Sequence, residues 1–116
     1  MKKFYVILSI LFCVHSSHAQ NSEIDSLKNA LAGANLADTT KIDLYLKLSS
    51  TFFPISIDSS ESYTKKAEFL SKLSGYYKID KIYGNKGLLQ YYAANQDSAH
   101  YYFEKALEKL DPRKDS

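Results

Sequence analysis

Two segments of this 116-residue chain resemble each other at an offset of 39 residues. The segment at 58–67, DSSESYTKKA, aligns with the segment at 97–106, DSAHYYFEKA, and five of the ten aligned positions are identical. Ser60 aligns with Ala99, so this position stays small. Upstream, the aromatic pair at 52–53 aligns with a second aromatic pair at 91–92. An offset that holds across two segments and the turn between them indicates a duplicated helix pair.

The first residues have the layout of a secretory signal peptide. A basic start is followed by an apolar run from Phe4 to Val14, and then by Ser17 and Ala19 before Gln20. Small residues at these two positions are typical of a cleavage site, so we expect residues 1–19 to be removed on export. An uncleaved anchor or a buried strand is the alternative. The apolar run is shorter than the roughly 20 residues that span a bilayer, and we expect no stable membrane span after cleavage.

Cleavage changes the composition that matters for function. Removing residues 1–19 takes two lysines and no acidic residue, which leaves 13 basic and 13 acidic residues and a net charge of zero. Such a balance argues against a nucleic-acid partner. The only cysteine, Cys13, is also removed, so no disulfide framework is available to an exported protein of this size. We therefore expect a periplasmic or secreted domain that is held together by packing.

Apolar spacing predicts an all-α chain of five short helices. We expect a leading helix and linker at 20–37, a first helix pair at 38–75, a second pair at 76–112 and a tail at 113–116. Within the first pair, Thr40 and Asp43 form a capping-box pattern, and Asp58 is expected to open the next helix. Pro54 should close the helix before it, because the residue that precedes proline is disfavoured in α geometry. The helices of the second pair should run from about 77 to 94 and from 97 onward.

The last helix carries a pattern that predicts close helix packing. Ala99 and Ala106 lie seven residues apart with Phe103 between them. Small residues at this spacing let two antiparallel helices approach closely, and the aromatic ring fills the wider gap. Gly87 should serve the same purpose on the facing helix, at a cost of about 1 kcal/mol relative to alanine. Pro112 cannot continue the helix.

The segment at 83–112 resembles a tetratricopeptide repeat (TPR). That family has an aromatic residue, a small residue four positions later, a small–aromatic–small series in its second helix and then a proline. The matching residues here are Tyr83, Gly87, Ala99, Phe103, Ala106 and Pro112. The pair at 38–75 is a degenerate version, in which Ala67 is kept. The resemblance implies antiparallel helix pairs stacked as a short α-solenoid, similar to the exported N-terminal arrays of bacterial sensor kinases and regulators.

The resemblance also implies a function. TPR proteins bind peptides or partner proteins in a groove lined by the first helix of each pair. Carried over to this chain, the groove candidates are Tyr45, Ser49, Phe52, Lys81, Asn85, Leu88 and Tyr92. This interpretation gives an exported, non-catalytic protein-binding scaffold. The alternative is a truncated sensory input domain of a bacterial membrane signalling protein, either a histidine kinase or a transcription regulator.

The sequence offers little that would support catalysis. We find no glycine-rich phosphate loop, no paired-histidine metal motif and no GxSxG elbow. His100 is the one histidine after residue 19, and Glu104 and Glu108 alternate with lysines in a way typical of a solvated face. We therefore expect no enzyme activity, no cofactor and no bound metal. We also expect Tyr101, Leu107 and Leu110 to lie partly uncovered, which favours self-association through the last helix pair.

Overall fold

The computed structural model describes residues 21–110, and within this range the chain consists of helices and turns with no strand. A helical segment at 21–31 leads into four helices. These are α2 (Asp38–Phe52), α3 (Ile57–Leu73), α4 (Ile79–Tyr92) and α5 (Gln96–Leu110). The all-α prediction is therefore confirmed. The expected signal peptide, Pro112 and the expected tail lie outside the described residues.

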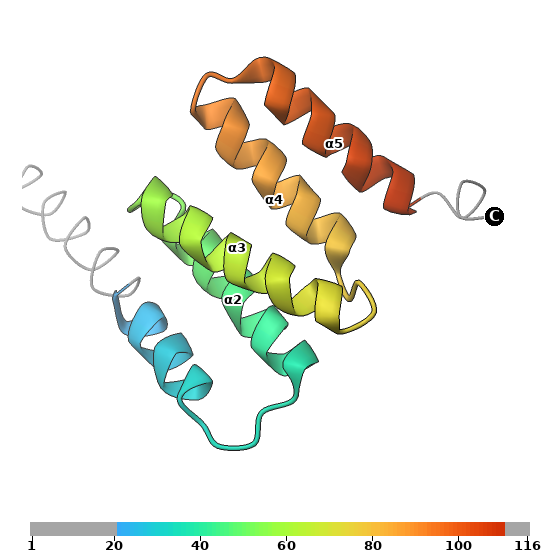
Figure 1. Cartoon of the computed structure of the whole chain (residues 1–116). Coiled ribbons are helices and arrows are strands. Elements are labelled where there is room, and N and C mark those ends of the chain that lie inside the picture. The colour runs from blue at the N-terminus through green and yellow to red at the C-terminus, as the bar shows by residue number, and fades with distance from the viewer. Residues whose placement is uncertain (1–20, 111–116) are drawn as a thin grey trace, which may run out of the picture.

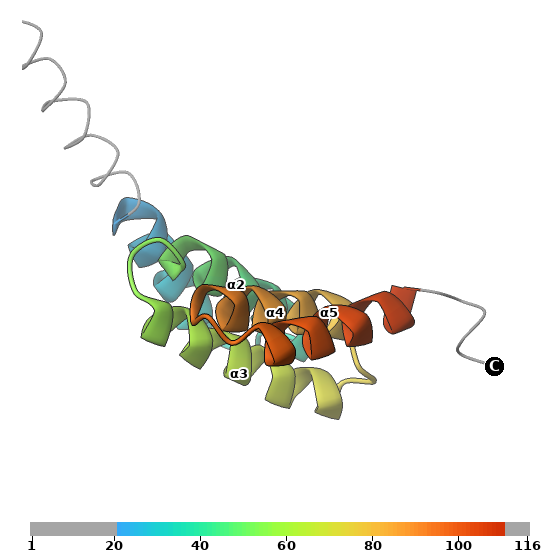
Figure 2. The same cartoon turned by 90° about the horizontal axis from the view of Figure 1, so that it is seen from above.

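The four helices form two antiparallel pairs that lie side by side (Figure 1). Helix α2 packs on α3 and α4 packs on α5, while α3 and α4 share a smaller contact that joins the pairs. The view from above in Figure 2 shows α3 displaced to one side of α2 and α4. The buried centre of this arrangement consists of Ile42, Ala67, Ile79 and Ile82, which come from α2, α3 and α4. These helices therefore share one core, because each contributes an apolar stripe to it.

Helix starts differ from those expected in the first pair. α2 begins at Asp38, and its N-cap residue, Ala37, makes no side-chain capping bond. The capping box expected from Thr40 is therefore wrong, because the helix begins before that residue. α3 begins after Ser56, whose hydroxyl accepts a hydrogen bond from the Ser59 amide at 3.2 Å. Serine and aspartate are both favoured N-caps. Here Ser56, two residues before Asp58, is the N-cap of α3.

Pro54 ends α2 by a different route from the one expected. Phe53 keeps right-handed α geometry, with φ −50° and ψ −49°, so it is not displaced by the proline that follows. Proline has no N–H to donate to the helix. The Phe52 carbonyl instead accepts hydrogen bonds from the amides of Ile55 and Ser56, at 2.8 and 2.7 Å. The chain thereby turns directly into α3.

The turn between the pairs delays the start of α4. Gly75, Tyr76 and Lys78 all have positive φ, at 69°, 64° and 54°. The left-handed region interrupts a right-handed helix, so α4 starts at Ile79 rather than near Tyr77 as expected. Lys78 is held in place from the first pair, because its ammonium group lies 2.7 Å from Asp43 in α2.

A buried hydroxyl network joins α2 to α3. The Ser49 hydroxyl lies 2.6 Å from the Thr64 hydroxyl and 3.1 Å from that of Ser60. Ser60 also donates to the Ser49 carbonyl at 2.8 Å, and Thr64 donates to the Ser60 carbonyl at 2.9 Å. All three side chains are at most 2% exposed. Each buried hydroxyl thus has a partner, which removes the cost of burying it.

In the second pair, α4 and α5 approach closely where Gly87 meets the Phe103 ring. A Cβ atom added to Gly87 would lie 2.6 Å from two carbon atoms of the Phe103 ring. Glycine is therefore the residue that fits here, as the sequence pattern predicts. Ala99 is buried and Ala106 is half-buried on the same helix as the ring. Tyr83 and Tyr102 stack beside this contact, with ring centroids 6.3 Å apart.

Candidate binding groove

Two adjoining hollows lie where the helix pairs meet. The smaller has a volume of about 180 Å³ and is lined by Ser49, Ser50, Phe53, Ser60, Asn85, Leu88 and Leu89. The larger has a volume of about 410 Å³ and is lined by Leu46, Ser50, Lys81, Gly84, Asn85, Leu88 and Phe103. The hollows share three residues, so they form one surface between α2 and α4. We call it the inter-pair groove.

Most of the candidates expected from the second pair do line this groove. Lys81, Asn85 and Leu88 occupy successive turns of α4 and all three contribute to its walls. Tyr92 does not line it, but its ring meets that of Phe53 edge-on, with centroids 4.8 Å apart. Leu88 is 45% exposed, so an apolar side chain is open to a ligand at the centre of the groove.

Two of the three candidates expected from the first pair do not line this groove. Tyr45 and Phe52 both stack on Tyr63 of α3, with centroid distances of 6.1 and 5.7 Å. Ser49 touches the floor of the smaller hollow, but its hydroxyl is engaged in the buried network. Tyr45 and Phe52 are therefore not among the residues that line the inter-pair groove. These residues pack within the first pair.

Besides Ser49, the residues that reach the groove from α2 and its C-cap each lie one position after an expected candidate. They are Leu46, Ser50 and Phe53. One residue corresponds to a rotation of about 100° around a helix with 3.6 residues per turn, which is enough to move a side chain from one interface to the next. Phe103 also lines the groove from α5, although its sequence pattern indicated only packing.

The groove combines apolar walls with a few polar groups. Leu46, Phe53, Leu88 and Phe103 supply most of the apolar surface. The Asn85 amide can donate and accept hydrogen bonds at once, which is what a peptide group requires of a partner. The exposed Lys81 ammonium lies beside it on the same helix, and it supplies a positive charge at one end. Such a surface holds an apolar side chain and orients the backbone that carries it.

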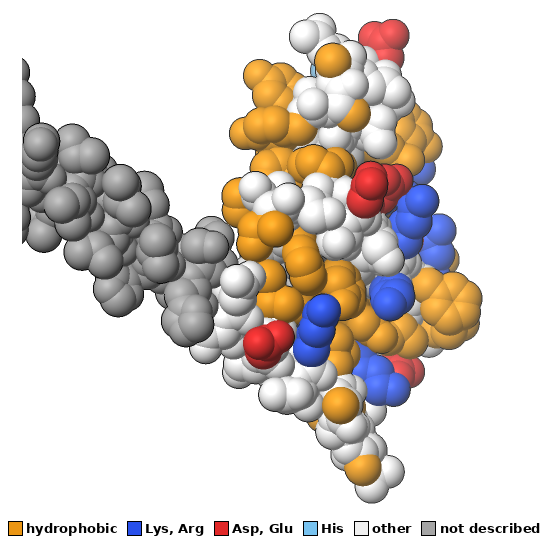
Figure 3. Space-filling model, turned by 90° about the vertical axis from the view of Figure 1, so that its left-hand side faces the viewer, with side chains coloured by type: hydrophobic (Ala, Val, Ile, Leu, Met, Phe, Trp, Pro, Cys, Tyr) orange, Lys and Arg blue, Asp and Glu red, His pale blue; other side chains and the backbone are white. Residues whose placement is uncertain are grey.

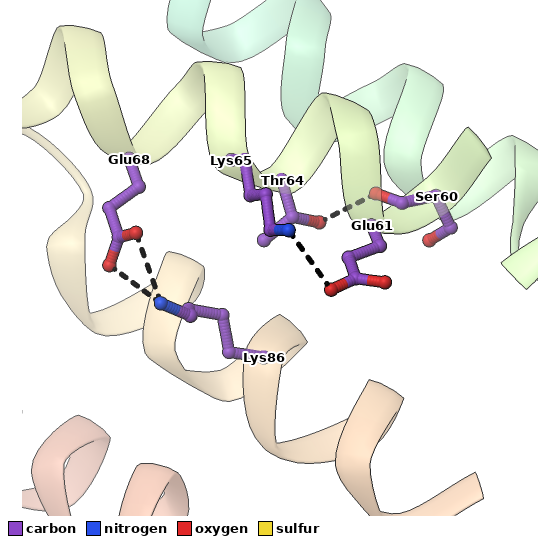
Figure 4. A network of polar contacts seen from close by, with 6 residues as sticks. All are labelled: Ser60, Glu61, Thr64, Lys65, Glu68 and Lys86. Atoms are coloured by element: carbon purple, nitrogen blue, oxygen red, sulfur yellow. Dashed lines mark hydrogen bonds and ion pairs between the residues drawn. The ribbon is translucent and has the colours of Figure 1, made fainter. Parts of the chain in front are cut away.

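An ion pair joins α3 to α4 (Figure 4). The Lys86 ammonium contacts both carboxylate oxygens of Glu68, at 2.9 and 3.0 Å. Burial lowers the pKa of Lys86, but the hydrogen bonds to Glu68 and its charge outweigh this effect and hold the pKa above its ordinary value. This contact joins the two helix pairs outside the inter-pair groove, because Lys86 lines neither of its hollows.

The outer side of α5 has little cover. Tyr101, Leu107 and Leu110 are 52%, 65% and 62% exposed, which confirms the expectation that these side chains lie uncovered among residues 21–110. Nor does this range contain a cluster of three or more His, Cys, Asp or Glu side chains arranged to hold a metal ion. None of the described helices is both long and apolar enough to cross a membrane.

In a comparison with known proteins, no family model, no curated protein and no solved structure matches this chain.

Proposed function

We propose that this chain is an exported TPR-type α-solenoid protein that binds a protein or peptide segment in the inter-pair groove and catalyses no reaction. The observation that supports this proposal is the position of Asn85 and Leu88 opposite Ser50 and Phe53. The first helices of the two pairs thus present apolar side chains and the Asn85 side-chain amide to the same hollow. The pattern at 83–112 and the paired helices agree with this assignment.

The shape of the groove favours an extended peptide over a compact small molecule. Its two hollows are linked through Ser50, Asn85 and Leu88, so an occupant can place one apolar side chain in the smaller hollow and continue along the larger one. Asn85 would bind the peptide group between them. Lys81 would attract an acidic side chain or a carboxyl terminus. The bound segment is therefore expected to carry an apolar residue followed by a negative charge.

Selection from a displayed peptide library tests this proposal. Peptides enriched on the purified protein should share the apolar–acidic pattern, and their affinity should fall about tenfold with Asn85→Ala and with Leu88→Asp. The Leu73→Asp variant is a control, because it alters another exposed leucine that lies outside the groove. Circular dichroism would establish that each variant is folded.

Enriched peptides that bind Leu88→Asp as tightly as the unaltered protein would place the binding surface elsewhere. A library that yields no sequence preference, with the protein folded, would also contradict the proposal.

A further inference from the structure

A third hollow lies on the first pair, between α2 and α3, away from the inter-pair groove. It has a volume of about 450 Å³ and is lined by Lys41, Tyr45, Lys65, Lys66, Phe69 and Leu70. None of these residues lines the inter-pair groove. Figure 3 shows lysine side chains beside hydrophobic side chains along one edge of this face of the molecule. We call this hollow the lysine-rimmed hollow.

The apolar part of the lysine-rimmed hollow is pre-formed. Tyr45 is half-buried and stacks on Tyr63, which in turn stacks on Phe52, so its ring is held by an aromatic series between α2 and α3. Leu70 is half-buried and packs against the central core. Phe69 is 67% exposed and forms the open wall. A ligand therefore meets two fixed apolar surfaces and one ring that it can cover.

The rim carries positive charge without compensation from its own lining. No carboxylate is among the six lining residues. Lys65 pairs with Glu61 at 3.3 Å, but Lys41 and Lys66 form no ion pair with a carboxylate within residues 21–110. The Lys66 ammonium instead lies 5.1 Å from the centroid of the Tyr63 ring. Two ammonium groups thus remain available to an anion at the edge of an apolar surface.

We propose that the lysine-rimmed hollow is a second binding site, and that it takes an apolar group bearing a carboxylate. The apolar body would cover Tyr45, Leu70 and Phe69, and the carboxylate would lie between Lys41 and Lys66. Lysine suits this task, because its long apolar stem packs against the ligand while its ammonium group remains in water. A small aryl or alkyl carboxylate has this chemistry, and so does the carboxyl terminus of a peptide that ends in an apolar residue.

Two pairs of probes distinguish these sources. The first pair is 4-phenylbutyrate and its uncharged amide; the second is a short peptide ending in leucine, with a free or an amidated terminus. Each is titrated into the ¹⁵N-labelled protein while amide chemical shifts are recorded. We expect shifts around Tyr45 and Phe69 with the free acids, and at least threefold weaker binding of the amides. The acid that binds more tightly identifies the source.

Single substitutions locate the site. Lys41→Gln and Lys66→Gln should each weaken binding of the preferred acid about threefold, since exposed ion pairs contribute modestly, and Phe69→Ala should weaken it about fivefold. Lys47→Gln is the matched charge control, because Lys47 is an exposed lysine of α2 outside the lysine-rimmed hollow. Leu73→Ala is the matched apolar control, because this side chain is 68% exposed on the same helix as Phe69. Neither control should change the affinity.

Three outcomes would overturn the proposal. The first is equal binding of acids and amides. The second is an equal loss with Lys47→Gln and with Lys66→Gln, which would indicate attraction by the overall charge. The third is sedimentation with anionic phospholipid vesicles that depends on Phe69 and both rim lysines, combined with no response to either acid. That result would make this face a membrane-binding surface instead.

Discussion

The two helix pairs solve the same packing problem with opposite choices of side chain. At the offset of 39 residues, Leu48 of α2 corresponds to Gly87 of α4, and Thr64 of α3 corresponds to Phe103 of α5. The first pair therefore has its large residue on the first helix, and the second pair has it on the second helix. Leu48 and Thr64 are both almost fully buried, and Gly87 meets the Phe103 ring directly.

The two solutions differ in what they add to apolar packing. With threonine in place of phenylalanine, the first pair has room for three buried hydroxyls that bond to one another. The second pair has a ring contact whose fit depends on the missing Cβ of Gly87. Hydrogen bonds fix direction, whereas ring packing depends on volume. The first interface should thus be sensitive to polarity and the second to size.

The pairs also differ in their surroundings. Glu68 of α3 binds Lys86 of α4, and Ser71 of α3 donates at 2.7 Å to the carbonyl of Tyr77 in the turn before α4. The equivalent positions of α5 are Leu107 and Leu110, which are 65% and 62% exposed. Polar residues therefore occupy the covered edge and leucines the uncovered one. This inverts the usual preference, because apolar side chains are normally the covered ones.

The largest effect is expected from Gly87→Leu. The new side chain would overlap the Phe103 ring, and overpacking of this kind costs about 3 kcal/mol of unfolding free energy. Phe103→Thr alone should cost about 2 kcal/mol, because the ring is half-buried. The double variant reproduces the Leu–Thr combination of the first pair, and its total loss should be no more than about 2 kcal/mol. Urea denaturation measures all three.

A double variant that loses the sum of the single losses would show that the two positions do not share one volume. The comparison between the pairs would then reflect sequence correspondence without packing equivalence.

Ser49→Ala tests whether the first pair depends on its hydroxyl network. Removing the Ser49 hydroxyl deletes two short contacts within a buried site, which should lower the unfolding free energy by about 1–2 kcal/mol. Ser50→Ala is the matched control, because it alters the next, exposed residue of α2 and should be neutral. Thermal unfolding of both variants gives the difference. Equal stability of the two variants would mean that packing alone holds the first pair.

Lys86→Gln tests the ion pair that joins the pairs, and should lower the unfolding free energy by about 1 kcal/mol at pH 7. The pKa of Lys86 is raised above its ordinary value of 10.5 in the folded protein. The contribution is therefore fully present below the ordinary value, and it disappears as the pH rises through the higher folded value. The difference from the unaltered protein should stay constant between about pH 7 and 9 and shrink above about pH 10.5. A difference that grows with pH would contradict this assignment.

The smallest effect on stability is expected from Leu107→Glu, since this side chain is exposed. We propose that the edge of α5 mediates self-association, so this variant should remain folded but lower the average mass measured by light scattering at micromolar concentration. Leu73→Glu is the control, because it alters an exposed leucine on α3. A protein that is already monomeric without substitution would contradict self-association through this edge.

Sequence patterns predicted which helices pair. They predicted less well which side of each helix faces the groove and where each helix begins and ends. The Gly87–Phe103 contact follows from residue size alone, and the structure contains it. The position of Ser49 does not follow from size, because serine suits a buried network and a groove equally well. Its aligned partner, Leu88, is 45% exposed, whereas Ser49 is 2% exposed. Ser49 is enclosed by its hydrogen-bond partners on α3, and local spacing in α2 cannot reveal that contact.

The helix ends show the same limit. Ser56 and Asp58 are both suitable N-caps. Ser56 takes this role because its amide bonds to the Phe52 carbonyl, so the turn after α2 leads directly into α3. Lys78 carries no sequence signal for left-handed geometry, which is uncommon for residues other than glycine, asparagine and aspartate. Its contact partner, Asp43, lies 35 positions earlier in the chain. Ends that depend on such distant contacts cannot be predicted from a local pattern.

The contact between Gly87 and Phe103 restricts how this sequence can change over time. Two substitutions convert the second pair to the combination found in the first, and they can occur in either order. Enlarging residue 87 first passes through a clash with the ring, whereas shrinking residue 103 first passes through a cavity. The cavity route leaves an intermediate that is more stable by about 1 kcal/mol, so this order of substitution is favoured over the other. Sequences that descend from this one should therefore carry a small residue at 103 before a large one appears at 87.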